Sequence, residues 1–141
     1  MPDFPLRERR RKEREWMTNL LLVIIGGAIG AGGRYLLSGR LHAQLGSEFP
    51  WGTFAVNVLG SLVIGLISGL AERGNLSSGA SLFLTVGVLG GFTTFSVFSY
   101  ETLRLLEAGN FAASLLNVFG QLTASVVAVY LGFAFTRLLA P

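Results

Sequence analysis

Four long apolar stretches alternate with short polar segments along the chain, and each is long enough to cross a bilayer as a helix. We predict spans over residues 19–37, 53–70, 82–106 and 111–139. The connecting segments are too short to hold a soluble domain, so the helices cross in up-down order and both termini lie on one side. The sequence therefore predicts an all-α integral membrane protein with four transmembrane helices.

Residues 1–17 differ from the rest because they are polar and highly charged. They contain six Lys/Arg and four acidic residues ahead of Trp16, which suits a membrane interface. This composition predicts a disordered or surface-lying tail, followed by a transmembrane domain over residues 18–141. A secretory signal is the alternative, but the apolar stretch that follows shows no clear cleavage site, which favours a retained span. Met17 is an alternative start of the chain.

The basic residues beside the spans bear on orientation. Counted from Met17, they divide two against three between the sides: Arg73 and Arg137 against Arg34, Arg40 and Arg104. So small a bias leaves the direction of insertion nearly undecided, whereas the six basic residues of the tail would fix both termini in the cytoplasm. We therefore expect that the functional chain starts near Met17, that the tail takes no part in insertion, or that a second, oppositely oriented subunit exists.

Two spans carry polar side chains at a spacing of four residues, which places each set on one helix face. These sets are Thr53, Asn57 and Ser61 on the second span, and Asn117, Gln121 and Ser125 on the fourth. Polar groups in lipid are costly unless they meet a partner or a water-filled path, so the stripes indicate a lined pathway. Interhelical hydrogen bonding is the alternative, and it is favoured for any single serine. An amide has four hydrogen-bonding sites to satisfy, so Asn57 and Gln121 are harder to explain in that way.

The middle of the third stretch combines glycines with hydroxyl side chains: Gly87, Gly90, Gly91, Thr93 and Thr94. This combination predicts a helix broken in mid-membrane, with exposed backbone carbonyls that suit an ion. The alternative is that Gly87 and Gly91 form a GxxxG pair for close helix packing, a role that we also expect of Gly26 and Gly30. Spacing alone leaves both interpretations open.

Phe95 and Phe98 share one helix face, with Ser96 between them. Such pairs usually fill a core, but phenyl rings have electropositive edges that stabilise an anion without a full charge. A full positive charge would bind an anion too tightly for release. The spans contain one such charge, Arg34, and it lies near the end of its helix, where it can reach the headgroups.

Several classes of protein are disfavoured by what the chain lacks. It has no cysteine, so neither a disulfide framework nor a cysteine metal site is possible. The single histidine, His42, falls in a loop, and the spans offer no general base, which argues against an enzyme. The net charge of +3 could indicate nucleic acid, but the basic residues cluster beside a span and favour membrane lipid. Glu101 lies toward the end of its span, where we expect it to pair with Arg34 or Arg104, or to face water.

Three motifs together resemble the Fluc/CrcB family of fluoride channels, in that family's order and spacing. They are GGAIGAGGRYLLS (26–38), WGTFAVNVLGSLVIG (51–65) and GGFTTFSVFSYE (90–101), and the resemblance covers residues 18–139. It implies a four-helix, dual-topology antiparallel homodimer with two fluoride pores and a central structural sodium ion at the break in the third helix. Such a protein would sit in the bacterial inner membrane and let cytoplasmic fluoride leave passively.

The resemblance also implies roles for individual residues. Phe95 and Phe98 would turn ring edges toward fluoride, and Asn57 and Ser125 would line its path. The full pathway implied is Phe95, Phe98, Asn57, Ser96, Ser125, Gln121 and Asn117, with Arg34 at a vestibule, Glu101 ending the motif, and the carbonyls of Gly90 and Thr93 holding Na⁺. Asn117 and Gln121 depart from the family pattern, in which relatives have tyrosine, serine or histidine. The charged tail has no counterpart in that pattern.

Two other classes of protein fit the sequence less well than the channel. A small four-helix multidrug or guanidinium exporter shares the size and dual topology, but it needs a membrane-embedded glutamate in its first helix. Residues 19–37 contain no acid. A noncatalytic membrane assembly factor would not require two aligned polar stripes. The sequence therefore predicts a fluoride-selective passive channel.

Overall fold

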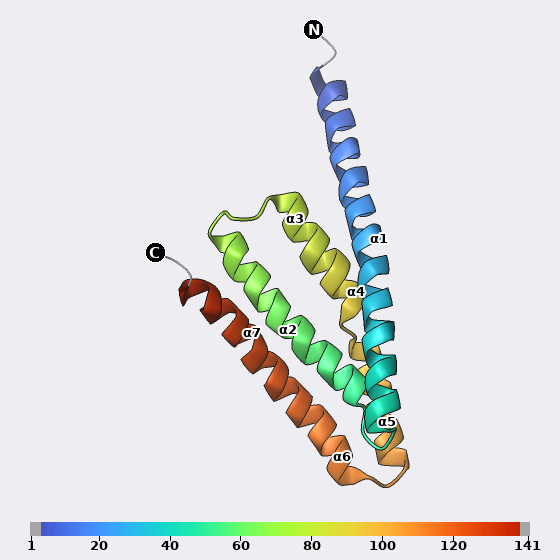
Figure 1. The fold of residues 1–141 in the computed structure, drawn as a ribbon. Coiled ribbons are helices and arrows are strands. Elements are labelled where there is room, and N and C mark those ends of the chain that lie inside the picture. The colour runs from blue at the N-terminus through green and yellow to red at the C-terminus, as the bar shows by residue number, and fades with distance from the viewer. Residues whose placement is uncertain (1–3, 139–141) are drawn as a thin grey trace.

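The computed structural model describes residues 4–138, which form a bundle of helices (Figure 1). Its elements, in chain order, are α1 (Phe4–Leu45), α2 (Trp51–Glu72), α3 (Ser78–Leu82), the π-helical segment η1 (Phe83–Leu89), α4 (Gly90–Phe92), α5 (Phe95–Glu107), α6 (Phe111–Leu115), the π-helical segment η2 (Leu116–Gly120) and α7 (Gln121–Leu138). The elements α3 to α5 make up the third predicted span, and α6 to α7 make up the fourth.

The four predicted spans are confirmed as long apolar helices. Within residues 4–138, the stretches with the length and hydropathy to cross a membrane are Leu6–Leu45, Trp51–Glu72, Ser78–Glu107 and Phe111–Leu138. The expected end of the last span, residue 139, lies outside the described residues. The closest packing is between alternate spans: the first packs on the third, and the second packs on the fourth.

The N-terminal tail is helical from Phe4 onward, so the expectation of disorder was wrong for these residues. Composition alone missed two physical effects. Arg, Lys and Glu are strong helix formers, and the tail extends a helix that the first span has already nucleated. Three ion pairs one turn apart add to this: Arg9–Glu13 at 3.1 Å, Arg11–Glu15 at 3.6 Å and Lys12–Glu8 at 3.3 Å.

Glycines let the backbones of neighbouring helices touch. A β-carbon added at Gly30 of α1 would lie 1.9 Å from the carbonyl oxygen of Val88, and one at Gly91 would lie 2.4 Å from that of Gly27. On the other side of the bundle, α2 and α7 run side by side (Figure 1), and a β-carbon at Gly65 would meet Val129 O at 2.2 Å. Small residues at helix contacts are typical of membrane bundles, in which close packing drives association.

We expect Gly30→Ala to destabilise the bundle by about 1–3 kcal/mol, because the added methyl group has no room and α1 must move away from the third span. Gly32→Ala is the matched control on the same helix, since a β-carbon there meets nothing within 4 Å. Thermal unfolding in detergent, followed by circular dichroism, measures both. Equal midpoints for the two variants would contradict the packing role of Gly30.

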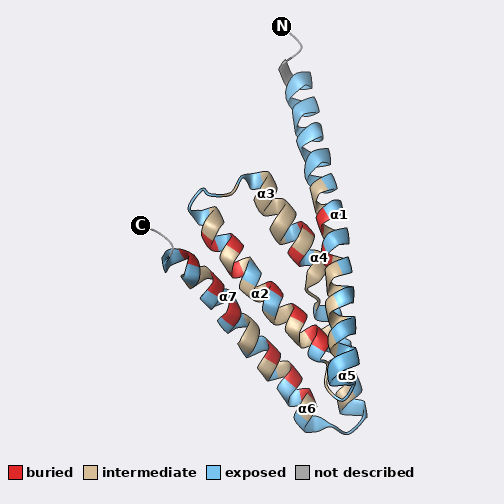
Figure 2. Cartoon of the chain, viewed as in Figure 1, coloured by how far each residue is buried: buried red, intermediate tan, exposed pale blue. Residues whose placement is uncertain are grey.

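Polar side chains take a large share of the buried positions, whereas many large apolar side chains are exposed. Figure 2 shows the buried residues as short segments on helices that are otherwise exposed or half-buried. Among the described residues, the buried polar side chains are Thr53, Ser114, Asn117, Gln121 and Thr136, and the buried hydrophobic ones are Val56, Ile67, Leu89 and Ala128. This is the reverse of a water-soluble domain. It fits a chain surrounded by lipid or by another apolar subunit.

Candidate functional site

The third span is interrupted at two threonines. Thr93 (φ −81°, ψ 160°) and Thr94 (φ −153°, ψ 126°) have extended backbones between the end of α4 and the start of α5. The Thr94 side chain accepts a hydrogen bond from the Val97 N–H and so caps α5. Gly90 stays helical, and Gly91 packs on α1. Gly87 also packs on α1, so the GxxxG pair Gly87 and Gly91 serves helix packing. The threonines, whose hydroxyls compete for backbone partners, carry the interruption.

The Asn57 side chain of α2 forms hydrogen bonds with both the N–H and the carbonyl of Thr94. Its Nδ2 donates to the Thr94 carbonyl at 2.9 Å, and its Oδ1 accepts from the Thr94 N–H at 2.8 Å. Backbone N–H and carbonyl groups that lack helical hydrogen bonds need other partners where water is excluded. One amide side chain thus holds the extended segment against α2.

Asn57 also begins a chain of hydrogen bonds that we call the amide relay: Asn57, Gln121, Asn117 and Thr102. Asn57 Nδ2 donates to Gln121 Oε1, and Gln121 Nε2 donates to Asn117 Oδ1 at 3.0 Å. Asn117 Nδ2 then donates to Thr102 Oγ1 at 2.9 Å. The two polar stripes therefore meet, and Asn117 and Gln121 act as interhelical partners, which was the alternative interpretation of these residues.

A cavity of about 370 Å³, open on one side, lies beside the interruption between α2, the third span and α7. It brings together Asn57, Gln121, Ser125, Phe95 and Phe98 of the expected pathway, along with the expected sodium ligands Gly90 and Thr93. Its other lining residues are Gly60, Ser61, Ile64, Thr85, Leu89, Thr94 and Leu122. Ser96, Asn117 and Arg34 do not line it.

Five of the lining residues were not singled out from the sequence: Gly60, Ile64, Thr85, Leu89 and Leu122. Thr85 and Leu89 belong to η1, and the hydroxyl of Thr85 donates to the Ser81 carbonyl at 2.7 Å. The signal for Thr85 was available, because it is a hydroxyl side chain two turns before Thr93 on the same span. Leu89 is an ordinary apolar residue, and the sequence gives no sign of its position.

The rings of Phe95 and Phe98 lie together at the margin of this cavity. Their centroids are 5.5 Å apart and their planes are tilted by 41°. Phe95 is 79% exposed, whereas Phe98 is partly buried. An exposed phenyl ring on an open cavity is costly in water, so this side of the chain is suited to contact with another apolar surface.

The hydrogen bonds at the interruption free two backbone carbonyls. In a continuous α-helix, the Thr94 N–H would bond to the Gly90 carbonyl and the Val97 N–H to the Thr93 carbonyl. Here the Thr94 N–H donates to Asn57, and the Val97 N–H donates to the Thr94 hydroxyl. The carbonyls of Gly90 and Thr93 therefore lack the donors that a continuous helix would give them. Residues 4–138 contain no cluster of three or more His, Cys, Asp or Glu that could hold a metal ion.

Glu101 pairs with a hydroxyl instead of an arginine, which corrects the expected pairing with Arg34 or Arg104. Its Oε1 accepts from the Thr53 hydroxyl at 2.9 Å. Arg104 pairs with Glu107 at 2.9 Å. Glu107 is exposed at the end of α5, so it can meet the long arginine side chain without desolvation.

Four apolar spans, three of which surround a cavity lined by amides, hydroxyls and phenyl rings, define a multi-pass membrane protein with a polar interior. Residues 21–133 match the family model described as "CrcB-like protein, Camphor Resistance (CrcB)". The chain belongs to this family, as the three motifs indicated.

The alignments with curated relatives cover almost the whole length of those relatives. A protein of Geobacter sulfurreducens named "Fluoride-specific ion channel FluC" is 48% identical over 122 residues, which cover 86% of this chain and 98% of the relative. Proteins with the same name from Thermus thermophilus and Magnetococcus marinus are 50% identical over 117 residues and 46% identical over 118. The aligned regions cover 83% of this chain in both cases, and 94% and 96% of the respective relatives.

Proposed function

We propose that this protein is a fluoride-selective passive channel that lets cytoplasmic fluoride leave the cell across the bacterial inner membrane. The observation that carries the proposal is the Phe95–Phe98 pair on a cavity lined by amides and hydroxyls. Ring edges stabilise an anion without the full positive charge that would trap it. The names of the curated relatives support the same function, and they do not favour the multidrug or guanidinium exporter.

Fluoride is small and strongly hydrated, so its passage requires donors at successive points that replace water without holding the ion. Both amide hydrogens of Asn57 are already used, by the Thr94 carbonyl and by Gln121 Oε1. In our proposal Asn57 exchanges its bond to Gln121 for one to fluoride and keeps its two bonds to Thr94. The hydroxyls of Ser61 and Ser125 line the same cavity and supply further donors.

The proposed functional unit is a homodimer of two oppositely oriented subunits, each with the interruption of its third span at mid-membrane. The exposed Phe95 ring and the open side of the cavity support this arrangement, because a second apolar subunit would cover both. Each subunit would contribute its own Phe95–Phe98 pair, which gives two pathways for each dimer.

The proposed cofactor is a structural sodium ion at the centre of this dimer. The Gly90 and Thr93 carbonyls fit it, because both have lost the donors that a continuous helix would give them. Carbonyl oxygens at broken helices suit hard monovalent cations. One subunit supplies two such oxygens, so a pair of subunits would supply four.

The test is fluoride efflux from liposomes that contain the purified full chain, measured with a fluoride electrode after a potassium ionophore is added. We expect rapid fluoride efflux, little chloride efflux from matched vesicles, and a loss of fluoride flux when sodium is replaced by a large organic cation. Equal rates for the two anions, or no fluoride efflux, would reject the function. Full fluoride flux without sodium would reject the proposed structural sodium ion but not the proposed fluoride transport.

A further inference from the structure

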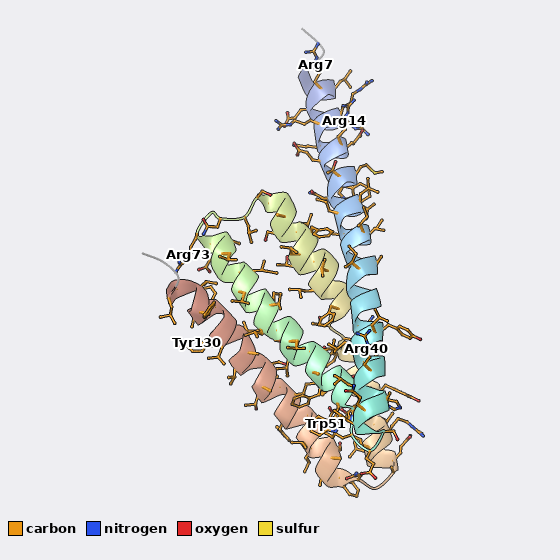
Figure 3. The ribbon with its side chains drawn as sticks, in the orientation of Figure 1. Arg7, Arg14, Arg40, Trp51, Arg73 and Tyr130 are labelled. Carbon is orange, nitrogen blue, oxygen red and sulfur yellow. The ribbon has the colours of Figure 1, made fainter. Side chains whose placement is uncertain are left out.

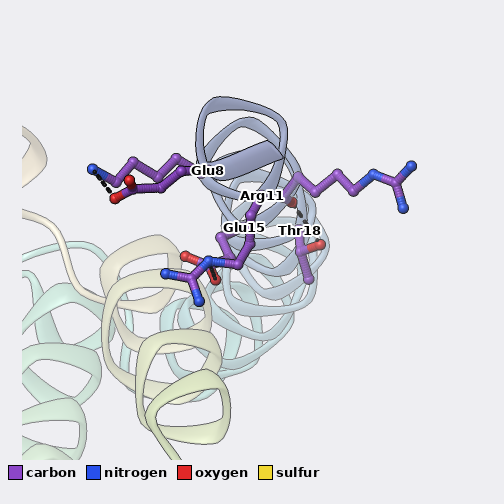
Figure 4. A network of polar contacts seen from close by, with 6 residues as sticks. Glu8, Arg11, Glu15 and Thr18 are labelled. Carbon is purple, nitrogen blue, oxygen red and sulfur yellow. Dashed lines mark hydrogen bonds and ion pairs between the residues drawn. The ribbon is translucent and has the colours of Figure 1, made fainter. Parts of the chain in front are cut away.

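The basic residues of α1 that precede Trp16 fall into two sets, one that forms ion pairs within the helix and one that does not. Arg9, Arg11 and Lys12 each pair with a glutamate one turn away. Figure 4 shows Glu8 on one side of the helix and the Arg11–Glu15 pair next to it. These basic side chains already have partners, which offset their charge.

The other three basic residues, Arg7, Arg10 and Arg14, form no ion pair within residues 4–138. At 3.6 residues per turn they lie within about 60° of one another around the helix, so they share one face. All three are exposed. Figure 3 labels Arg7 and Arg14 on the part of α1 that projects beyond the other helices. We call Arg7, Arg10 and Arg14 the arginine stripe.

The stripe has a fixed height above the membrane, because α1 is a single helix from Phe4 to Leu45. Tryptophan side chains gather at membrane interfaces, and we place the interface at Trp16 on this basis. At 1.5 Å per residue, Arg14, Arg10 and Arg7 begin about 3, 9 and 14 Å beyond it. The headgroup layer is about 5–8 Å thick, and the Debye length in the cell is about 8 Å. All three therefore lie within reach of headgroup charge, and Arg14 lies deepest.

We propose that the arginine stripe is a binding site for the anionic phospholipid headgroups of the leaflet from which this end of α1 emerges. A guanidinium is always charged, and its planar fork binds phosphate through two parallel hydrogen bonds. Among residues 4–16, the neighbouring ion pairs leave the arginines of the stripe as the basic side chains without an acidic partner in that range. Nucleic acids and acidic proteins carry the same sign of charge, but only headgroups are held at this height beside the helix. The site is independent of fluoride conduction.

The experiment uses the purified full chain in a mild detergent with equal amounts of phosphatidylglycerol and phosphatidylcholine, and mass spectrometry counts the lipids retained. We expect the wild-type chain to be enriched in phosphatidylglycerol. Loss of the stripe in R7Q/R10Q/R14Q should lower this enrichment by about fivefold for each arginine, toward the level that the rest of the chain gives. The matched control, R9Q/R11Q/K12Q, removes the same number of charges from paired positions and should retain most of the enrichment.

Three outcomes would overturn the proposal. The first is a wild-type chain with no preference for phosphatidylglycerol. The second is an equal loss in both triple variants, which would make net charge, not the stripe, the cause. The third is displacement of bound phosphatidylglycerol by a short single-stranded RNA at equal concentration, which would identify a nucleic-acid site. Circular dichroism of both variants ensures that a lost helix is not mistaken for a lost site.

Discussion

We expect fluoride efflux to fall about tenfold or more in Phe95→Ile and in Phe98→Ile, with folding and assembly of the variant proteins unchanged. Isoleucine keeps an apolar side chain at each position but removes the electropositive ring edge, and aromatic interactions of this kind contribute up to about 1.5 kcal/mol each. The electrode assay in liposomes measures the flux. Gel filtration and circular dichroism establish that the variant proteins are intact.

Phe119→Ile is the control for this loss. Phe119 is also an exposed phenylalanine, at 62%, but it lies in η2 and does not line the cavity. Its replacement should leave fluoride efflux unchanged. Wild-type flux in both Phe95→Ile and Phe98→Ile would show that the rings do not contact the ion.

Asn57→Ala should destabilise the protein by about 3 kcal/mol or more and abolish fluoride efflux. The change leaves the Thr94 N–H, the Thr94 carbonyl and Gln121 Oε1 without their partner. Each buried polar group left unsatisfied costs about 1–3 kcal/mol. A lower midpoint of thermal unfolding in detergent, recorded by circular dichroism, is the expected measurement.

Two further variants separate hydrogen bonding from volume. Asn57→Leu retains the bulk of the side chain without its amide, so it should be destabilised like the alanine variant. Ser68→Ala, on the exposed part of the same helix, should unfold at the wild-type temperature. If Asn57→Leu is as stable as wild type, the bonds to Thr94 do not hold the third span in place.

The four spans could be predicted because hydropathy and length decide them almost alone. Their observed ends lie only a few residues from those expected, apart from the two ends of α1. This helix continues past the expected residue 37 to Leu45, so Arg40 and His42 lie on a helix and not in the expected loop. The error at the N-terminal end came from treating charge as a sign of disorder. Composition does not register that opposite charges one turn apart, such as Arg9 and Glu13, support a helix.

The sequence predicted many of the residues at the candidate site, but it did not predict most of the hydrogen bonds that connect them. The spacing of the two polar stripes was enough to bring Asn57 and Gln121 together. The contact between Asn57 and the Thr94 backbone joins residues 37 apart in the sequence, and no local pattern encodes it. Ser96 was expected beside the pathway because it lies between two phenylalanines. A helix turns by about 100° per residue, and this turn carries Ser96 off the cavity face.

Arg104 illustrates a choice that the sequence leaves undecided. It stands three residues from Glu101 and three from Glu107, so helical spacing favours both pairs equally. The bundle decides between them, because Thr53 of α2 donates to Oε1 of Glu101 and the other oxygen, Oε2, is buried away from the arginine. Glu107 remains accessible and takes the arginine.

Because α1 is one continuous helix, its N-terminal end moves together with the first span. Residues 4 to 16 extend about 18 Å beyond the interface at 1.5 Å per residue. A tilt of about 20°, typical of membrane helices, would carry the tip about 6 Å sideways. A small change in the tilt of the first span therefore moves the N-terminal end of α1 farther sideways than it moves the residues inside the bilayer. A binding partner or an antibody that holds this end would oppose the change in tilt.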